Sequence, residues 1–138
     1  MKIIEKAAAL LGACTEVTLA SVSEDGYPRI CVLSKVKSEG IGKVYVATGM
    51  ISTKTRHFQT NPKASVCAWK DGNSITLVGK VTVSQERAIL EEMWLDWFID
   101  HFQGGVDDPN YCVLIFETTE ATLWIDGEFV TVGSEDFR

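Results

Sequence analysis

The sequence has few of the residues from which metal and dithiol redox sites are built. Its 138 residues include two histidines, His57 and His101, and four cysteines, none of which form a Cys-x-x-Cys pair. Zinc and dithiol sites usually need such pairs or clusters. The sequence therefore predicts no metal site, and it predicts that most of the cysteines pack in strands as free thiols.

Long apolar runs and basic stretches are missing too. No apolar stretch approaches the length of a membrane span, and the run from Ala7 to Leu11 is too short for a secretory signal. Thirteen basic residues against nineteen acidic ones give a net charge of -6, which repels nucleic acid. We therefore expect a cytoplasmic protein with neither a membrane nor a nucleic acid as partner.

The composition and pattern indicate a mainly β fold. Apolar residues make up 46% and charged residues 23%, which is typical of an ordered globular domain. Alternating and apolar runs predict strands at 16–22, 28–36, 43–48, 64–69, 74–83, 111–117, 121–126 and 129–132. Helical spacing predicts helices at 2–11 and 52–60 and a long one from Ser84, its N-cap, to about Phe102. Short strands joined by hairpin turns favour an antiparallel β-barrel with flanking helices, as a single domain over residues 1–138.

The most informative segment is a strand that ends at Thr48 and is followed by Ser52, Thr53 and Lys54 at the start of a helix. The first turn of a helix exposes unpaired N–H groups and favours negative charge, so these three residues would make a phosphate site. The alternative is an ordinary N-cap followed by a solvated lysine. Arg29 is a second candidate donor, because its planar guanidinium suits an anion, or it points to solvent.

No catalytic constellation is present in the sequence. Neither histidine has a neighbouring nucleophile with an orienting carboxylate, so no catalytic residue is predicted, and a cofactor would supply any chemistry. The aromatic helix ending near Phe102 is expected to pack on the barrel and to add a surface for self-association. Trp124 lies on a late strand, where it belongs either to the core or to the binding site of a flat aromatic ligand.

Three segments resemble a known family. The first is Thr48-x-x-x-Ser52-Thr53-Lys54-x-x-x-Phe58-x-x-Asn61-Pro62-x-Ala64, the second runs from Gly26 to Leu33, and the third from Ser74 to Val81. Together they are similar to the FMN-binding split barrels of the pyridoxamine phosphate oxidase-like superfamily, and most to its general stress protein 26-like branch. The likeness covers roughly residues 5 to 130.

The resemblance implies a homodimer with FMN at the subunit interface and a small-molecule electron donor or acceptor. It gives Ser52, Thr53 and Lys54 the phosphate and places Arg29 close by. It sets the remaining cofactor-binding residues along the isoalloxazine ring: Ile30, Cys31, Val32, Leu33, Thr48 and Trp124, the last of them from the partner chain.

Two departures separate the chain from the true oxidases of this superfamily. Those enzymes have a glutamine where this chain has Ser74, and they carry an Arg-rich C-terminal substrate motif that is missing here. The resemblance therefore implies an FMN-dependent oxidoreductase of unassigned substrate, not a pyridoxamine phosphate oxidase. The alternatives are a non-catalytic, stress-related flavin sensor or carrier, and a deazaflavin- or haem-binding member of the same fold.

Overall fold

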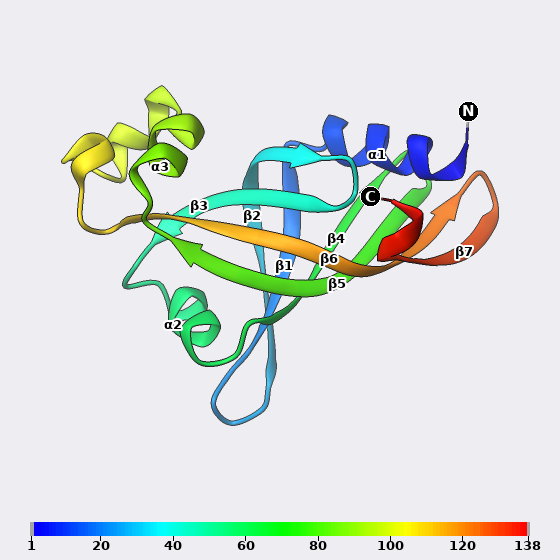
Figure 1. The fold of residues 1–138 in the computed structure, drawn as a ribbon, viewed down its shortest axis with the longest axis horizontal. Helices are drawn as coiled ribbons and strands as arrows, with labels where there is room; N and C mark the ends of the chain where they lie inside the picture. Colours follow the sequence, from blue (N-terminus) through cyan, green and yellow to red (C-terminus); the bar gives the residue numbers. More distant parts are fainter. Residues whose placement is uncertain (1, 138) are drawn as a thin grey trace.

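The computed structural model describes residues 2–137, which fold around a closed antiparallel β-barrel (Figure 1). The strands follow the order β3-β2-β1-β4-β5-β6-β7, and a further pairing of β3 with β6 closes a ring of six. β7 pairs only with the last part of β6 and lies outside the ring. This architecture confirms the predicted mainly β fold with flanking helices.

The barrel strands are short to medium in length, except for β6. The strands are β1 Glu16–Val22, β2 Pro28–Glu39, β3 Lys43–Gly49, β4 Lys63–Lys70, β5 Asn73–Ser84, β6 Tyr111–Ile125 and β7 Glu128–Gly133. The α-helices are α1 Ile3–Ala13, α2 Thr53–Thr60 and α3 Arg87–Met93, and the 3-10 helices are η1 Asp96–Asp100, η2 Gly105–Asp107 and η3 Ser134–Asp136.

Two helices cover opposite ends of the barrel. α1 leads into the start of β1 and buries Ala7, Leu10 and Leu11 in the main core. Its last carbonyls are satisfied by Lys35, whose Nζ donates to Leu11 O at 2.5 Å and to Gly12 O at 3.1 Å. α2 lies at the far end of β1, between β3 and β4 along the chain (Figure 1).

The long strand β6 replaces the two separate strands predicted at 111–117 and 121–126. Its register against β5 shifts between Val78 and Gly79, so that Thr119 is an extra residue in β6. This bulge exchanges the two faces of the strand: Phe116 and Thr118 are buried before it, and Ala121 after it. A bulge lets one strand bend around the barrel without a break in its pairing, so the two predicted segments are one strand.

The predicted helix from Ser84 to Phe102 is wrong in extent. Ser84 is the last residue of β5, the helix α3 begins at Arg87, and the chain becomes extended at Trp94 and Leu95 before η1. The extended backbone brings the Trp94 ring to 5.3 Å from the Tyr111 ring and 5.5 Å from the Phe98 ring. This second aromatic core, shared with β6, outweighs the helix propensity of the segment.

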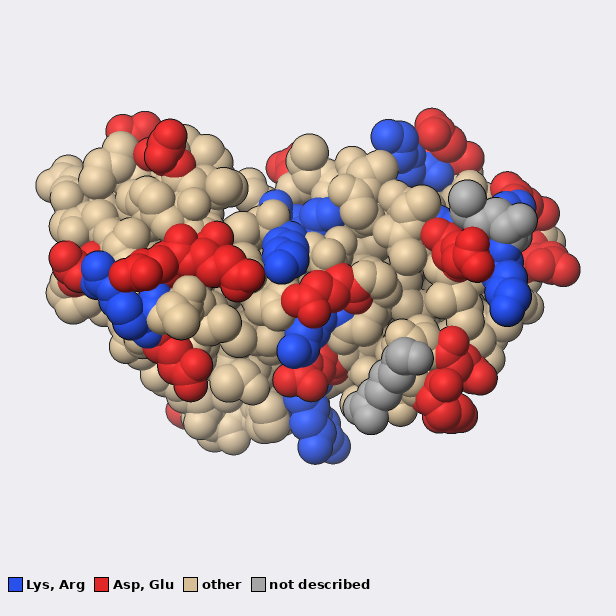
Figure 2. Space-filling model, turned by 45° about the horizontal axis from the view of Figure 1, so that its top comes forward, with Lys and Arg blue, Asp and Glu red and all other residues tan. Residues whose placement is uncertain are grey.

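The surface carries charges of both signs in close mixture. Figure 2 shows a face on which acidic and basic side chains lie side by side, with broad uncharged areas between them. Within residues 2–137, no helix is long and apolar enough to cross a membrane.

A substitution at Gly79 tests how closely β5 and β6 pack at the bulge. A Cβ at this position would lie 1.9 Å from the Glu117 carbonyl oxygen, so Gly79→Ala forces two backbones apart. We expect Gly79→Ala to lower the free energy of unfolding by about 3 kcal/mol or slightly more, as overpacking of a rigid site does. Urea denaturation measures this change.

The matched control is Gly12→Ala, because nothing lies within 4 Å of its added Cβ and the position is helical. That variant should be neutral or stabilised by up to about 1 kcal/mol. Equal stability of the two variants would contradict the close approach of β5 and β6.

Candidate functional site

A hollow of about 180 Å³ lies between the start of α2 and the neighbouring ends of β1 and β2. It collects positive charge and hydroxyl groups from segments that are distant in sequence. Arg29 comes from β2, and Lys54 comes from α2 with Ser52 just before it. The lining residues are Ser21, Arg29, Ile30, Cys31, Ser52, Thr53, Lys54 and His57.

The turn before α2 is held by a set of hydrogen bonds. Gly49 O accepts from Ser52 N at 3.1 Å and from the buried Thr55 hydroxyl at 2.7 Å. Asn110 accepts a bond from Ile51 N at 3.1 Å through Oδ1. These bonds fix where the first turn of α2 begins, and therefore where its unpaired N–H groups lie.

Ser52 does not act as an ordinary N-cap. It occupies the N-cap position, but its side chain makes no capping bond to the helix. Instead, Ser52 Oγ accepts a hydrogen bond from Lys54 Nζ at 2.8 Å. The lysine is thereby drawn back over the start of the helix, toward the hollow, rather than extended into solvent as the alternative interpretation required.

Strand alternation decides which β2 residues reach the hollow from inside. Arg29 pairs with the buried Ser21 and Cys31 pairs with the buried Leu19, so both point to the face that borders the hollow, where Arg29 is exposed and Cys31 half-buried. Ile30 pairs with Ala20 on the outer face and is 71% exposed, although it still borders the hollow. The predicted continuous stretch along β2 is thus divided between two faces.

Four of the predicted cofactor-binding residues lie outside the hollow. Val32 is exposed on the outer face, whereas Leu33 packs against the main core. Thr48 is buried on β3, where its carbonyl accepts a bond from the Cys112 thiol at 3.4 Å. Trp124 lies on β6 beyond the bulge, with its ring 4.6 Å from that of Phe129.

Sequence reasoning missed Ser21 and His57. His57 is half-buried, and its Nδ1 lies 2.8 Å from the Oγ of Ser21, which is 3% exposed. The spacing of three residues from Lys54 on a helix was the available signal, since such residues share a face. Arg56, by contrast, is exposed and does not line the hollow, as that same spacing predicts.

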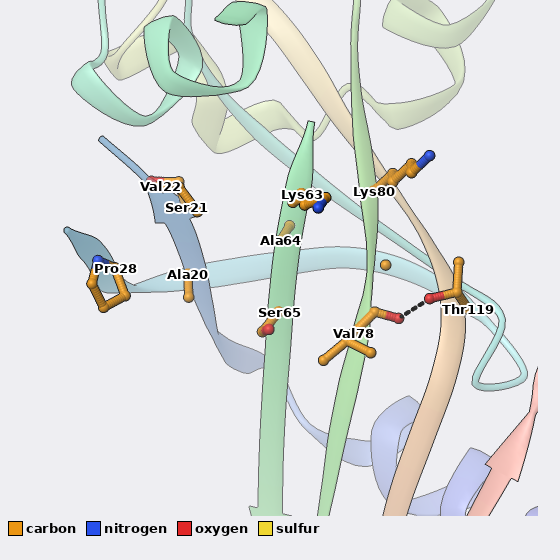
Figure 3. A pocket seen from close by; sticks show the side chains of 11 residues that line it. Ala20, Ser21, Val22, Pro28, Lys63, Ala64, Ser65, Val78, Lys80 and Thr119 are labelled. Carbon is orange, nitrogen blue, oxygen red and sulfur yellow. Dashed lines mark hydrogen bonds between the residues drawn. The ribbon is translucent and has the colours of Figure 1, made fainter. Parts of the chain in front are cut away.

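A second hollow, of about 390 Å³, adjoins the first because Ser21 lines both (Figure 3). Its floor is formed by strands β1, β4 and β5, and the bond from Thr119 Oγ1 to Val78 O borders it at 3.1 Å. Lys63 and Lys80, which are register partners, stand at its rim. Among residues 2–137, no group of three or more His, Cys, Asp or Glu residues is placed to hold a metal ion.

Cys112 lies in the barrel wall close to Lys54 and Thr55. Burial raises the pKa of its thiol to about 11, against smaller opposing effects of the Thr55 hydrogen bond and the Lys54 charge. At neutral pH this cysteine is therefore a thiol and not a nucleophile.

The fold, taken with this site, is that of a split-barrel protein. The family model for pyridoxamine 5'-phosphate oxidase matches residues 3–125, and the chain belongs to that family. No curated protein matches the sequence.

Solved structures share the whole architecture. A Clostridium acetobutylicum protein related to general stress protein 26 is similar with a TM-score of 0.85 and 21% identity, over 99% of both chains. General stress protein 26 of Bacillus anthracis has a TM-score of 0.79 and 22% identity, over 96% of this chain and all of the other. A haem-binding protein of Mycobacterium smegmatis reaches 0.76 at 16% identity, over 98% of this chain and 59% of the other. At these identities the likeness shows a common fold.

The raised pKa of Cys112 gives a prediction for the barrel wall beside the site. At pH 8, only about one in a thousand Cys112 side chains is a thiolate, which is the reactive form. With an aromatic disulfide reagent at pH 8, Cys112 should react only after denaturation, and Cys112→Ser should remove that late thiol. Reaction of Cys112 in the folded protein at the rate of the half-buried Cys31 would contradict its burial.

Proposed function

We propose that this chain is a dimeric FMN-binding protein, a flavin-dependent oxidoreductase that acts on a small-molecule electron donor or acceptor. The observation that carries the proposal is the hollow in which Arg29 and Lys54 meet the hydroxyls before α2. Family membership supports it, because members of this family bind flavin or haem. The substrate is left unassigned.

The donors in the hollow suit a phosphate monoester. Such a group carries a charge between -1.5 and -2 near neutral pH and three acceptor oxygens. Arg29 and Lys54 supply two positive charges, and Ser52 and Thr53 add hydroxyls beside the N–H groups that open α2. Among the described residues that line the hollow, none carries a carboxylate that would repel the phosphate.

The ring of the cofactor would lie along the outer face of β2. Ile30 and Val32 are 71% and 60% exposed there, next to the hollow, and offer apolar contact to a flat ring. Leu33 and Thr48 would support this surface from within the barrel. The flavin supplies the electron transfer when it is bound, and these residues bind and orient it.

The same outer face supports a dimer. Across β2, β1, β4, β5, β6 and β7, register partners form a row of outward side chains without any charge: Val32, Thr18, Cys67, Thr76, Thr122 and Thr131. Exposed Trp69, Val78 and Phe129 lie beside this row. A row of uncharged outward side chains flanked by exposed apolar ones is typical of a buried interface. Pairing through it would let Trp124, on this face, approach the partner's cofactor.

The cofactor is tested by the absorption spectrum of the purified protein after FMN is added and the excess removed. The proposal expects a flavin spectrum that persists and one FMN per chain released on denaturation. A colourless protein would overturn it, and a haem spectrum would favour the haem-binding alternative. Bound flavin that no nicotinamide or acceptor can reduce or oxidise would favour a sensor or carrier.

Lys54→Met should weaken FMN binding roughly 10- to 100-fold, because a hydrogen bond to a charged group contributes about 1.5–3 kcal/mol. Quenching of flavin fluorescence during titration measures the dissociation constant. Riboflavin, which lacks the phosphate, should bind Lys54→Met and the unmodified protein equally.

Arg56→Met is the matched control, since Arg56 is on the same helix but outside the hollow. It should leave FMN affinity within about twofold, as loss of an exposed charge usually does. Equal losses of FMN affinity in the two variants would show that binding depends on net charge and not on the position of the charge in the hollow.

Thr76→Arg should convert the dimer to a monomer, because it places a charge at the centre of the uncharged row. Sedimentation velocity gives the mass of the assembly. Thr82→Arg is the control, as Thr82 is exposed on the same strand beyond the bulge. A Thr76→Arg protein that remains dimeric would place the interface elsewhere.

A further inference from the structure

His57 and Ser21 form a pair at the wall of the cationic hollow. His57 follows Lys54 by about one helical turn on α2, and both side chains line the hollow with Arg29. The imidazole Nδ1 lies 2.8 Å from Ser21 Oγ. Since Ser21 occupies Nδ1, Nε2 is the ring nitrogen available to a ligand.

The serine hydroxyl is suited to either charge state of the imidazole. A hydroxyl donates one hydrogen bond and accepts others. It donates to Nδ1 of a neutral ring whose proton is on Nε2, and it accepts from Nδ1–H of a protonated ring. In both states Nε2–H remains a donor, so Ser21 holds the ring while its charge changes.

The charges around the pair are positive. Lys54 on the same helix and Arg29 on β2 share the hollow with the side chain of Cys31. The two strands that pack on α2 add little: β1 has only Glu16, five residues before Ser21, and β5 has only Lys80. Arg56, also on α2, is exposed. Arg29 and Lys54 thus oppose a further positive charge in the hollow, and a bound dianion would favour one.

We propose that His57, held by Ser21, is a third donor to the phosphate and gains a proton on Nδ1 from solvent when a phosphate dianion binds. The hollow would then present three positive groups to two negative charges. Such a site prefers a terminal phosphate monoester to a neutral or singly charged group. This inference rests on the proposed function of the hollow as the phosphate site of FMN.

Calorimetry of FMN binding at pH 7.5 tests the inference through the protons exchanged. At this pH a histidine is mostly neutral and a phosphate monoester is mostly dianionic, so uptake reports on the imidazole and not on the ligand. Titrations in three buffers of different ionisation enthalpy give the number of protons taken up. We expect on the order of half a proton per site in the unmodified protein.

Three variants complete the experiment. His57→Asn, which keeps a polar side chain of similar reach, should bind FMN with no proton uptake and about 3- to 10-fold more weakly, as loss of one donor to an anion predicts. His101→Asn, at the exposed end of η1, should keep the full uptake and affinity. Ser21→Ala, which releases the ring, should reduce the uptake as well.

The outcomes separate the two proposals. FMN binding without proton uptake, or uptake that persists in His57→Asn, would overturn the role of His57 and leave the phosphate site standing. Failure of the unmodified protein to bind FMN at all would overturn the proposed function and this inference with it.

Discussion

The pairing of β3 with β6 is the contact on which the rest of the structure depends. Seven register pairs, from Lys43 with Glu117 to Gly49 with Tyr111, close the ring and leave neither strand with an open edge there. β6 runs unbroken along β5, pairing with β3 before the bulge at Thr119 and with β7 after it, and the bulge lets the strand bend between the two. Gly79 permits the bulge, because no side chain fits against the Glu117 carbonyl.

The candidate site follows from this closure. α2 is the connection that leaves the end of β3, and Asn110, just before β6, holds its turn through Ile51 N. With β3 fixed against β6, the start of α2 faces the ends of β1 and β2, and Lys54 meets Arg29. The barrel thereby gathers two positive charges in one hollow, and the bond from Lys54 to Ser52 holds one of them over the start of α2.

The proposed cofactor, dimer and proton uptake share one physical basis. A rigid barrel carries exposed apolar side chains on β2 beside a small cationic hollow, so the apolar and phosphate ends of one ligand can be bound side by side. An imidazole can accept a proton when a phosphate binds beside it, which an arginine or lysine side chain, already charged, does not do. Phosphate binding through His57 would therefore be coupled to the uptake of a proton, whereas binding through arginine or lysine alone would not.

The sequence by itself determined the local features: the alternating strands, the Ser52-Thr53-Lys54 helix start and the resemblance of these segments to a family. These depend on periodicity and on chemistry within a few residues. Only the tertiary structure decided the continuous β6, the break of the aromatic helix at Trp94, and the position of Trp124 away from the hollow. It also decided that His57 meets Ser21, 36 residues earlier. Each of these depends on contacts between distant strands, and closure of the barrel outweighs what the local pattern favours.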